Sequence, residues 1–155
     1  MTLVWRAEPH EARAVVSLLV EFRDWLGRSL PSEESFAASV DRLIGERNTE
    51  YLLGATAPGS PASAVCQLRF RFGVWHDAWD CWLEDLFVVE DARRSGLGAA
   101  LVEAALSRAR ERRCARVELD VNEANRAAVA LYERFGFGAF SESLGARDLL
   151  MRRNL

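Results

Sequence analysis

The chain has 155 residues, of which 50% are hydrophobic and 28% are charged, and its formal net charge is −3 at pH 7. This length suffices for a core that needs no disulfide or metal, so we expect a single domain over residues 1–155. The sequence has no signal-peptide pattern and no run of about 18 apolar residues, and its acidic balance disfavours general nucleic-acid binding, so we expect a cytoplasmic protein with no membrane or nucleic-acid partner.

The first third of the chain predicts two helices between two strands. Residues 3–6 predict a strand, and the proline and acids of residues 8–11 are typical of a helix start. Apolar residues then recur at spacings of three and four as far as Leu26, and Gly27 ends this first helix. A second helix is predicted after Pro31, followed by a strand over residues 50–57.

The rest of the chain continues this mixed pattern. Long strands are predicted for residues 62–72 and 80–89, joined by an aromatic loop. A third helix runs from Leu97 to near Arg113, a strand covers residues 116–121, a fourth helix covers residues 125–135, and strands at 137–141 and 149–153 close the chain. We therefore predict a mixed α/β (α+β) fold in which about four helices flank one mixed central sheet of about seven strands.

The cysteines and histidines do not form a recognisable metal or disulfide pattern. Cys66, Cys81 and Cys114 are odd in number, far apart and without a C-x-x-C pair, so we expect reduced thiols in or near the core. His76 has no second histidine or paired cysteines near it in the sequence, and we expect no metal site.

A glycine-containing loop lies between a predicted strand and a predicted helix, where free N–H groups and the helix dipole attract phosphate. A Walker loop is excluded because the chain has no lysine. A dinucleotide-binding fingerprint requires glycine or alanine where Leu101 stands. The loop therefore predicts an anion site of another kind, with the sequence Arg93-Arg94-Ser95-Gly96-Leu97-Gly98-Ala99.

This loop matches the coenzyme A motif Gln/Arg-x-x-Gly-x-Gly/Ala, and the chain resembles the GNAT superfamily of N-acetyltransferases. Residues 125–137 are similar to that family's later signature N-x-x-A-x-x-L-Y-x-x-x-G-F. The resemblance implies a splayed central sheet and an enzyme that uses acetyl-CoA. It also implies that residues 93–99 hold the pyrophosphate, while the pantetheine arm pairs with the backbone of Leu86, Phe87 and Val88.

A base is required because an amine of pKa about 10.4 is neutral in only roughly one molecule in two thousand at pH 7. Glu84 precedes the cofactor loop on a predicted strand, and family members often carry a carboxylate there as the base, so Glu84 is our first choice. Its neighbour Asp85 faces the opposite side of a regular strand, although a bulge would reverse the choice.

The second signature supplies two further residues by resemblance. Tyr132 occupies the place of the tyrosine that donates a proton to the departing thiolate in many family members. Asn125 is expected to cap the fourth helix and to hydrogen-bond the pantetheine arm.

Residues 71–88 show a closer resemblance to the diamine (spermidine/spermine) acetyltransferase branch, in which an aromatic loop precedes a Leu-Glu-Asp strand. We therefore expect the acceptor to be a small primary amine, either a polyamine or an amino-acid-like molecule. Aminoglycosides and protein amino termini stay open as alternative acceptors. A catalytically silent acetyl-CoA sensor stays open as an alternative function, and a homodimer as a possible assembly. The residues expected to bind the acceptor are Trp25, Trp75, Trp79, Glu84 and Asp85.

Overall fold

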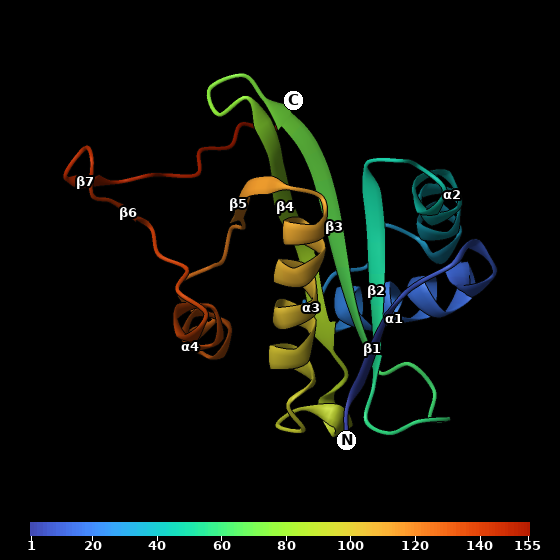
Figure 1. Cartoon of the computed structure of the whole chain (residues 1–155). Coiled ribbons are helices and arrows are strands. Elements are labelled where there is room, and N and C mark those ends of the chain that lie inside the picture. Colours follow the sequence, from blue (N-terminus) through green and yellow to red (C-terminus); the bar gives the residue numbers. More distant parts are fainter. The chain divides into compact units, whose positions relative to one another are not determined.

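Alternating apolar residues build a five-stranded sheet in the first of two compact units, Met1–Leu119, within a computed structural model that describes residues 1–155. Neighbouring strands are antiparallel except β5, which runs parallel to β4. The strands follow one another across the sheet in chain order (Figure 1). They are β1 (Leu3–Arg6), β2 (Thr49–Ala55), β3 (Ala64–Gly73), β4 (Ala78–Val88) and β5 (Cys114–Glu118).

Helices cover both faces of this sheet. The 3₁₀ turn η1 (Pro9–Glu11) leads into α1 (Ala12–Trp25), and α2 (Glu33–Ile44) begins where the Ser32 hydroxyl accepts a hydrogen bond from the Ser35 N–H. Helices α1 and α2 share one apolar cluster with Leu53, Val65 and Phe87 of the strands. Helix α3 (Leu97–Glu111) packs in a second cluster with the alternate strand residues, such as Leu52, Leu68 and Leu83. The period-two alternation along the strands therefore assigns each side chain to one of two helical layers.

The three cysteines are free thiols, as the sequence predicts. Cys66 and Cys81 are buried in the α3 cluster. Burial raises the pKa of the Cys66 thiol and raises that of Cys81 to about 12, so both remain protonated and unreactive near neutral pH.

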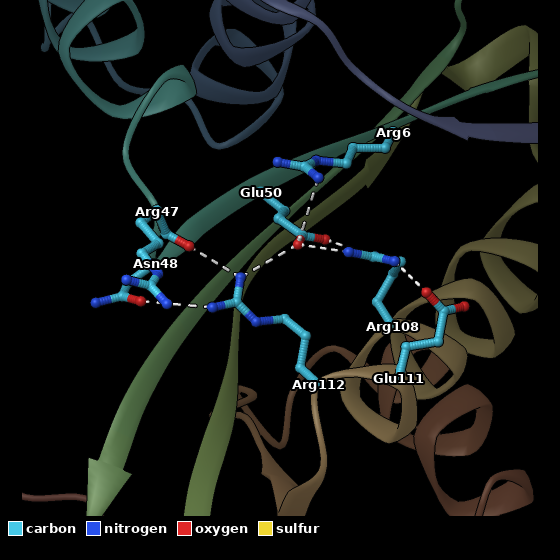
Figure 2. Close-up of polar contacts among 7 residues, drawn as sticks. All are labelled: Arg6, Arg47, Asn48, Glu50, Arg108, Glu111 and Arg112. Carbon is cyan, nitrogen blue, oxygen red and sulfur yellow. Dashed lines mark hydrogen bonds and ion pairs between the residues drawn. The ribbon is translucent and has the colours of Figure 1, made fainter.

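A buried carboxylate attaches the last turns of α3 to β2, as Figure 2 shows. Glu50 is 2% exposed and accepts two hydrogen bonds of 2.8 Å from Arg108, through Nε and Nη2. Arg112 Nη1 lies 3.3 Å and Arg6 Nη1 lies 3.9 Å from the Glu50 carboxylate. Arg108 also pairs with Glu111. The α3 helix is therefore fixed to the sheet by charge as well as by apolar packing.

Strand β4 carries a bulge and then separates from β5. Leu83 pairs with Leu68 and Asp85 pairs with Gln67, so Glu84 is an extra residue without a partner in the register. Strand β5 accompanies β4 only from Trp79 to Trp82. From Leu83 onward the β4 edge that faces away from β3 is no longer paired with β5, which is the splay expected for this sheet.

The second compact unit, Asp120–Leu155, contains α4 (Arg126–Arg134) and a short hairpin of β6 (Phe140–Ser141) and β7 (Ala146–Arg147). Arg152 Nη2 donates to Asp120 Oδ2 at 2.6 Å within this unit. The expected strand at residues 149–153 is absent. In the turn, the Gly145 N–H donates a hydrogen bond to the Ser141 carbonyl. The strand that pairs with β6 is therefore β7, which follows the turn directly and ends at Arg147.

The mixed α/β class and the four helices are confirmed. Seven strands form, but they are divided between a five-stranded and a two-stranded sheet, where the sequence had suggested one sheet. The single domain over residues 1–155 stays a prediction, because the contacts define two units. None of the helices combines the length and the apolar character needed to cross a membrane.

Candidate acetyl-CoA and acceptor site

The glycine loop connects the end of β4 to the start of α3 through the 3₁₀ turn η2 (Glu90–Ala92). Gly96 is the N-cap of α3 with a φ of +91°, a left-handed conformation that favours glycine. It offers no capping side chain, and the first turn of α3 contains no acidic residue. The first N–H groups of a helix have no acceptor within the helix and lie at the positive end of its dipole. The donor set of residues 96–99 therefore fits a pyrophosphate.

The two arginines of the loop differ in their surroundings. Arg94 is exposed and has a φ of +61°, which is uncommon for a residue with a side chain. Arg93 is partly buried, and its Nε donates to the Val88 carbonyl at 3.1 Å. The Arg93 guanidinium carbon also lies 5.0 Å from the centroid of the Trp25 ring. Only Arg94 is placed as a freely solvated cation.

The backbone expected to pair with the pantetheine arm lies at the end of β4. Leu86, Phe87 and Val88 pair on one edge with Cys66, Val65 and Ala64 of β3. Their opposite edge lies beyond the last residue that β5 accompanies. An extended chain can therefore add to this edge as a further strand.

The bulge decides how the two candidate carboxylates are presented. Before it, Leu83 packs in the α3 cluster, and after it Phe87 packs in the α1–α2 cluster, so Asp85 shares the α1–α2 face with Phe87. Glu84, the extra residue, is exposed, whereas Asp85 is partly buried. The two carboxylates are therefore neighbours at one distortion of the strand, with different exposure.

Two neighbours of this acidic pair were missed by sequence reasoning. Tyr51 pairs with Gln67, and Gln67 pairs with Asp85, so the three side chains form a row across β2, β3 and β4. Tyr51 is 2% and Gln67 is 6% exposed. Burial, and then the charge of Asp85, raise the pKa of Tyr51 to about 12; Arg69 opposes the rise, and Glu84 and Glu46 add smaller contributions to it. Only the pairing register reveals this row, and no local sequence motif marks it.

The three expected acceptor tryptophans are not brought together. Trp25 lies 6.4 Å from Phe87, between ring centroids, at the end of β4. Trp79 packs against the α3 cluster, near Phe72, and lies close to the start of β4, about 25 Å from Phe87 along the strand. Trp75 is 97% exposed in the turn between β3 and β4. Trp25 alone is thus placed beside the glycine loop.

The remaining expected site residues belong to the second unit. Asn125 Oδ1 accepts a hydrogen bond of 3.2 Å from the Ala128 N–H and caps α4. Tyr132 is 8% exposed and contacts Phe137 edge to face, with ring centroids 5.8 Å apart. The capping role of Asn125 is confirmed.

The fold, the splayed strand and the glycine loop at a helix start define a class of acyl-transferring proteins. Residues 12–137 match the acetyltransferase (GNAT) family, and the chain belongs to that family. Members of the family use acetyl-CoA as the acetyl donor, as expected from the sequence.

Several characterised proteins are similar to this chain. Thialysine N-epsilon-acetyltransferase of Mus musculus is 26% identical over 133 residues, which are 82% of this chain and 76% of the mouse protein. Mycothiol acetyltransferase of Salinispora arenicola is 53% identical over 57 residues, or 36% of this chain. The 5-NmdU N-acetyltransferase of Pseudomonas phage PaMx11 is 39% identical over 64 residues, or 41% of this chain. The matches span only 19% of the mycothiol enzyme and 44% of the phage enzyme.

Solved structures show the same fold. A protein from Arthrobacter sp. FB24, assigned to the acetyltransferases, superimposes with a TM-score of 0.87 and 27% identity, covering 99% of this chain and 96% of the other. An aminoglycoside acetyltransferase from an uncultured soil metagenomic sample has a TM-score of 0.79 and 15% identity, with 99% and 96% coverage. At that identity the second likeness concerns the fold alone.

Proposed function

We propose that this chain is an N-acetyltransferase that transfers the acetyl group of acetyl-CoA to a primary amine of a small molecule, polyamine or amino-acid-like, in a ternary complex. The observation that carries the proposal is the bulge in β4, which presents Glu84 and Asp85 just before the strand edge and glycine loop suited to coenzyme A. Acidic side chains at this position suit an acceptor that arrives as an ammonium ion.

The proposed roles in acetyl transfer follow from the chemistry of the amine. Glu84 takes the proton of the ammonium group, directly or through a water molecule, and the neutral nitrogen then forms a bond to the acetyl carbon. Bound acetyl-CoA supplies the thioester whose carbon–sulfur bond breaks. Backbone N–H groups beside Leu86 polarise the thioester carbonyl, and Tyr132 gives its phenolic proton to the leaving sulfur. As the amide forms, the nitrogen releases its second proton, which returns through water to the Tyr132 phenolate.

The proposed cofactor contacts follow the same elements. The backbone edge of Leu86, Phe87 and Val88 pairs with the pantetheine arm, and Asn125 contributes a hydrogen bond to it. The loop residues Arg93, Arg94, Ser95, Gly96, Leu97, Gly98 and Ala99 form the pyrophosphate site, mainly through backbone N–H groups.

The acceptor site is proposed at Trp25, Glu84 and Asp85. Support for a small amine comes from the mouse relative, whose name gives thialysine as its substrate, and from the Leu-Glu-Asp strand shared in pattern with the diamine branch. Trp75 and Trp79 lie at the other end of β4, so they contact the acceptor only if it is a long polyamine that extends along the strand. A homodimer and a cytoplasmic location stay expectations.

The test is acetyl-CoA-dependent release of free thiol across polyamines, amino acids including thialysine, aminoglycosides and peptides. Glu84→Gln is the informative variant, and Glu103→Gln, on the exposed side of α3, is its matched control. A signal for one amine class that is lost in Glu84→Gln and kept in Glu103→Gln supports the proposal and identifies the acceptor class. Binding of acetyl-CoA without thiol release for any amine would instead indicate a non-catalytic sensor.

A further inference from the structure

A single arginine of the glycine loop joins three segments that are distant in the sequence. Arg93 donates from Nε to the Val88 carbonyl at the end of β4. Its guanidinium carbon lies 5.0 Å from the ring centroid of Trp25, the last residue of α1, and 5.9 Å from that of Phe87. Both distances are within the range of a cation–π interaction.

The two aromatic partners of Arg93 differ in burial: Phe87 belongs to the core, whereas Trp25 is about half exposed. Phe87 is 5% exposed and stacks on Phe22 with centroids 5.0 Å apart and an interplanar angle of 20°. Trp25 contacts both of these rings but leaves 49% of its surface exposed. The buried pair therefore gives Trp25 a fixed support, and Arg93 contacts the Trp25 ring from the glycine loop.

Trp25 directly precedes the connection between α1 and α2, residues 26–32. Arg23 Nη1 donates to the Pro31 carbonyl at 2.9 Å, so the far end of this connection is attached to the last turn of α1. The connection is therefore held at both ends by the last turn of α1, by chain continuity after Trp25 and by Arg23 at Pro31. This connection borders the acceptor site in the proposed function.

We propose that Arg93 is a positioning residue: it ties the glycine loop and the end of β4 to Trp25, so that coenzyme A binding and the acceptor-side connection are coupled. Arg94 is then the arginine whose charge serves the diphosphate. The left-handed φ of Arg94 and its exposure are consistent with this division, because strained residues with side chains cluster at ligand sites. The coupling to the ligand rests on the proposed function, whereas the contact between Arg93 and Trp25 does not.

The two roles predict different responses to salt and to substitution. A phosphate contact is charge against charge and weakens as salt rises, whereas a cation–π contact supported by a carbonyl changes little. Removing the Arg93–Trp25 contact should weaken binding by about two- to tenfold. Removing Trp25 in addition to Arg93 should add nothing to the loss from Arg93 alone, because Trp25 acts through Arg93.

The first test measures coenzyme A binding by calorimetry between about 50 and 500 mM NaCl. The variants are Arg93→Gln, Arg94→Gln, Trp25→Leu and the double variant Arg93→Gln/Trp25→Leu, with Trp25→Phe as the conservative rescue. We expect Arg94→Gln to flatten the salt dependence and Arg93→Gln to leave its slope unchanged. We expect the double variant to bind as the Arg93 variant does, and Trp25→Phe to retain wild-type affinity. Additive losses at Arg93 and Trp25, or a flattened slope in Arg93→Gln, would overturn the proposal.

The second test needs no ligand. Hydrogen exchange of the amides of residues 89–96 should become several-fold faster in Trp25→Leu and remain at the wild-type rate in Trp25→Phe. Unchanged exchange in Trp25→Leu would show that Trp25 does not hold the loop. If the wild-type chain failed to bind coenzyme A, the proposed function would fail, and the exchange experiment would still decide whether Arg93 and Trp25 act together.

Discussion

Two groups of acidic side chains on the same sheet have opposite environments. Glu50 is buried on the α3 side, where Arg108, Arg112 and Arg6 surround its carboxylate. Glu84 and Asp85 lie at the bulge of β4, one exposed and the other partly buried. Glu50 has all its electrostatic partners within the fold, whereas Glu84 retains access to solvent and thus to a ligand. The difference separates a charge that stabilises the structure from one that is available for chemistry.

The contrast between the two acidic sites is tested first by a substitution at Glu84. Glu84→Gln should lower kcat by about 10²–10⁴-fold at neutral pH, since it removes the proposed base, and by less at high pH, where more of the amine is already neutral. Its free energy of unfolding should stay within about 0.5 kcal/mol of wild type, because the side chain is exposed. A pH–rate profile identical to that of wild type would remove Glu84 from the mechanism.

Glu50 should respond in the opposite way. Glu50→Gln removes the charge that Arg108, Arg112 and Arg6 share and leaves Arg108 with only the exposed Glu111. It should lower the free energy of unfolding by about 2–3 kcal/mol, somewhat less than for a fully buried pair because the arginines are partly exposed. Urea denaturation measures the loss. Glu111→Gln removes the exposed partner of Arg108 and should cost at most about 1 kcal/mol. Equal losses in the two variants would contradict the central role of Glu50.

A substitution at Tyr132, in the second unit, tests the proposed proton donor. Tyr132→Phe keeps the ring that contacts Phe137 and removes the phenolic proton donor. We expect kcat to fall by about 10–100-fold while the affinity for acetyl-CoA changes little. Losses of equal size in kcat and in acetyl-CoA affinity, measured by steady-state kinetics and calorimetry, would indicate a packing role instead.

The pH dependence of the unfolding free energy is a second test of the stabilising role of Glu50. Burial by itself raises the pKa of Glu50, but the hydrogen bonds and charge of Arg108, together with Arg6 and Arg112, outweigh it and hold the pKa below its ordinary value. The stability from this group is therefore present above the unfolded pKa of about 4.3 and is lost as the pH falls through the lower folded value. The difference in unfolding free energy between wild type and Glu50→Gln should shrink below pH about 4. A difference that stayed constant down to pH 3 would disprove the linkage.

The smallest effect is expected at Tyr51. Its phenol stays protonated below pH about 12 and presents an O–H group in the row that contains Asp85. Tyr51→Phe should raise the KM for the acceptor about two- to fivefold and leave kcat within a factor of two, as expected for one hydrogen-bond donor near a binding carboxylate. A fall in kcat without a change in KM would place Tyr51 in the chemical step.

Much of the fold could be predicted because it depends on local patterns. The apolar stripe as far as Leu26 predicted the end of α1 to within one residue, and Leu97 was correctly predicted as the start of α3. The hairpin in the second unit shows the limit. The apolar residues 149–151 led to the prediction of a strand at 149–153, yet the turn at Gly145 places β7 at Ala146–Arg147. Which segment pairs depends on turn geometry, and hydropathy does not encode it.

The sequence by itself determined the family, the acetyl donor of that family, the glycine loop and the acidic residues before it, because these depend on residue types at fixed spacing. Tertiary structure decided the rest. The extra residue at Glu84 sets which face Asp85 occupies, the register brings Tyr51 and Gln67 beside it, and packing turns Arg93 toward Trp25. The physical reason is that strand register and side-chain packing join residues far apart in the chain, and a one-residue shift in pairing changes the face of every side chain that follows.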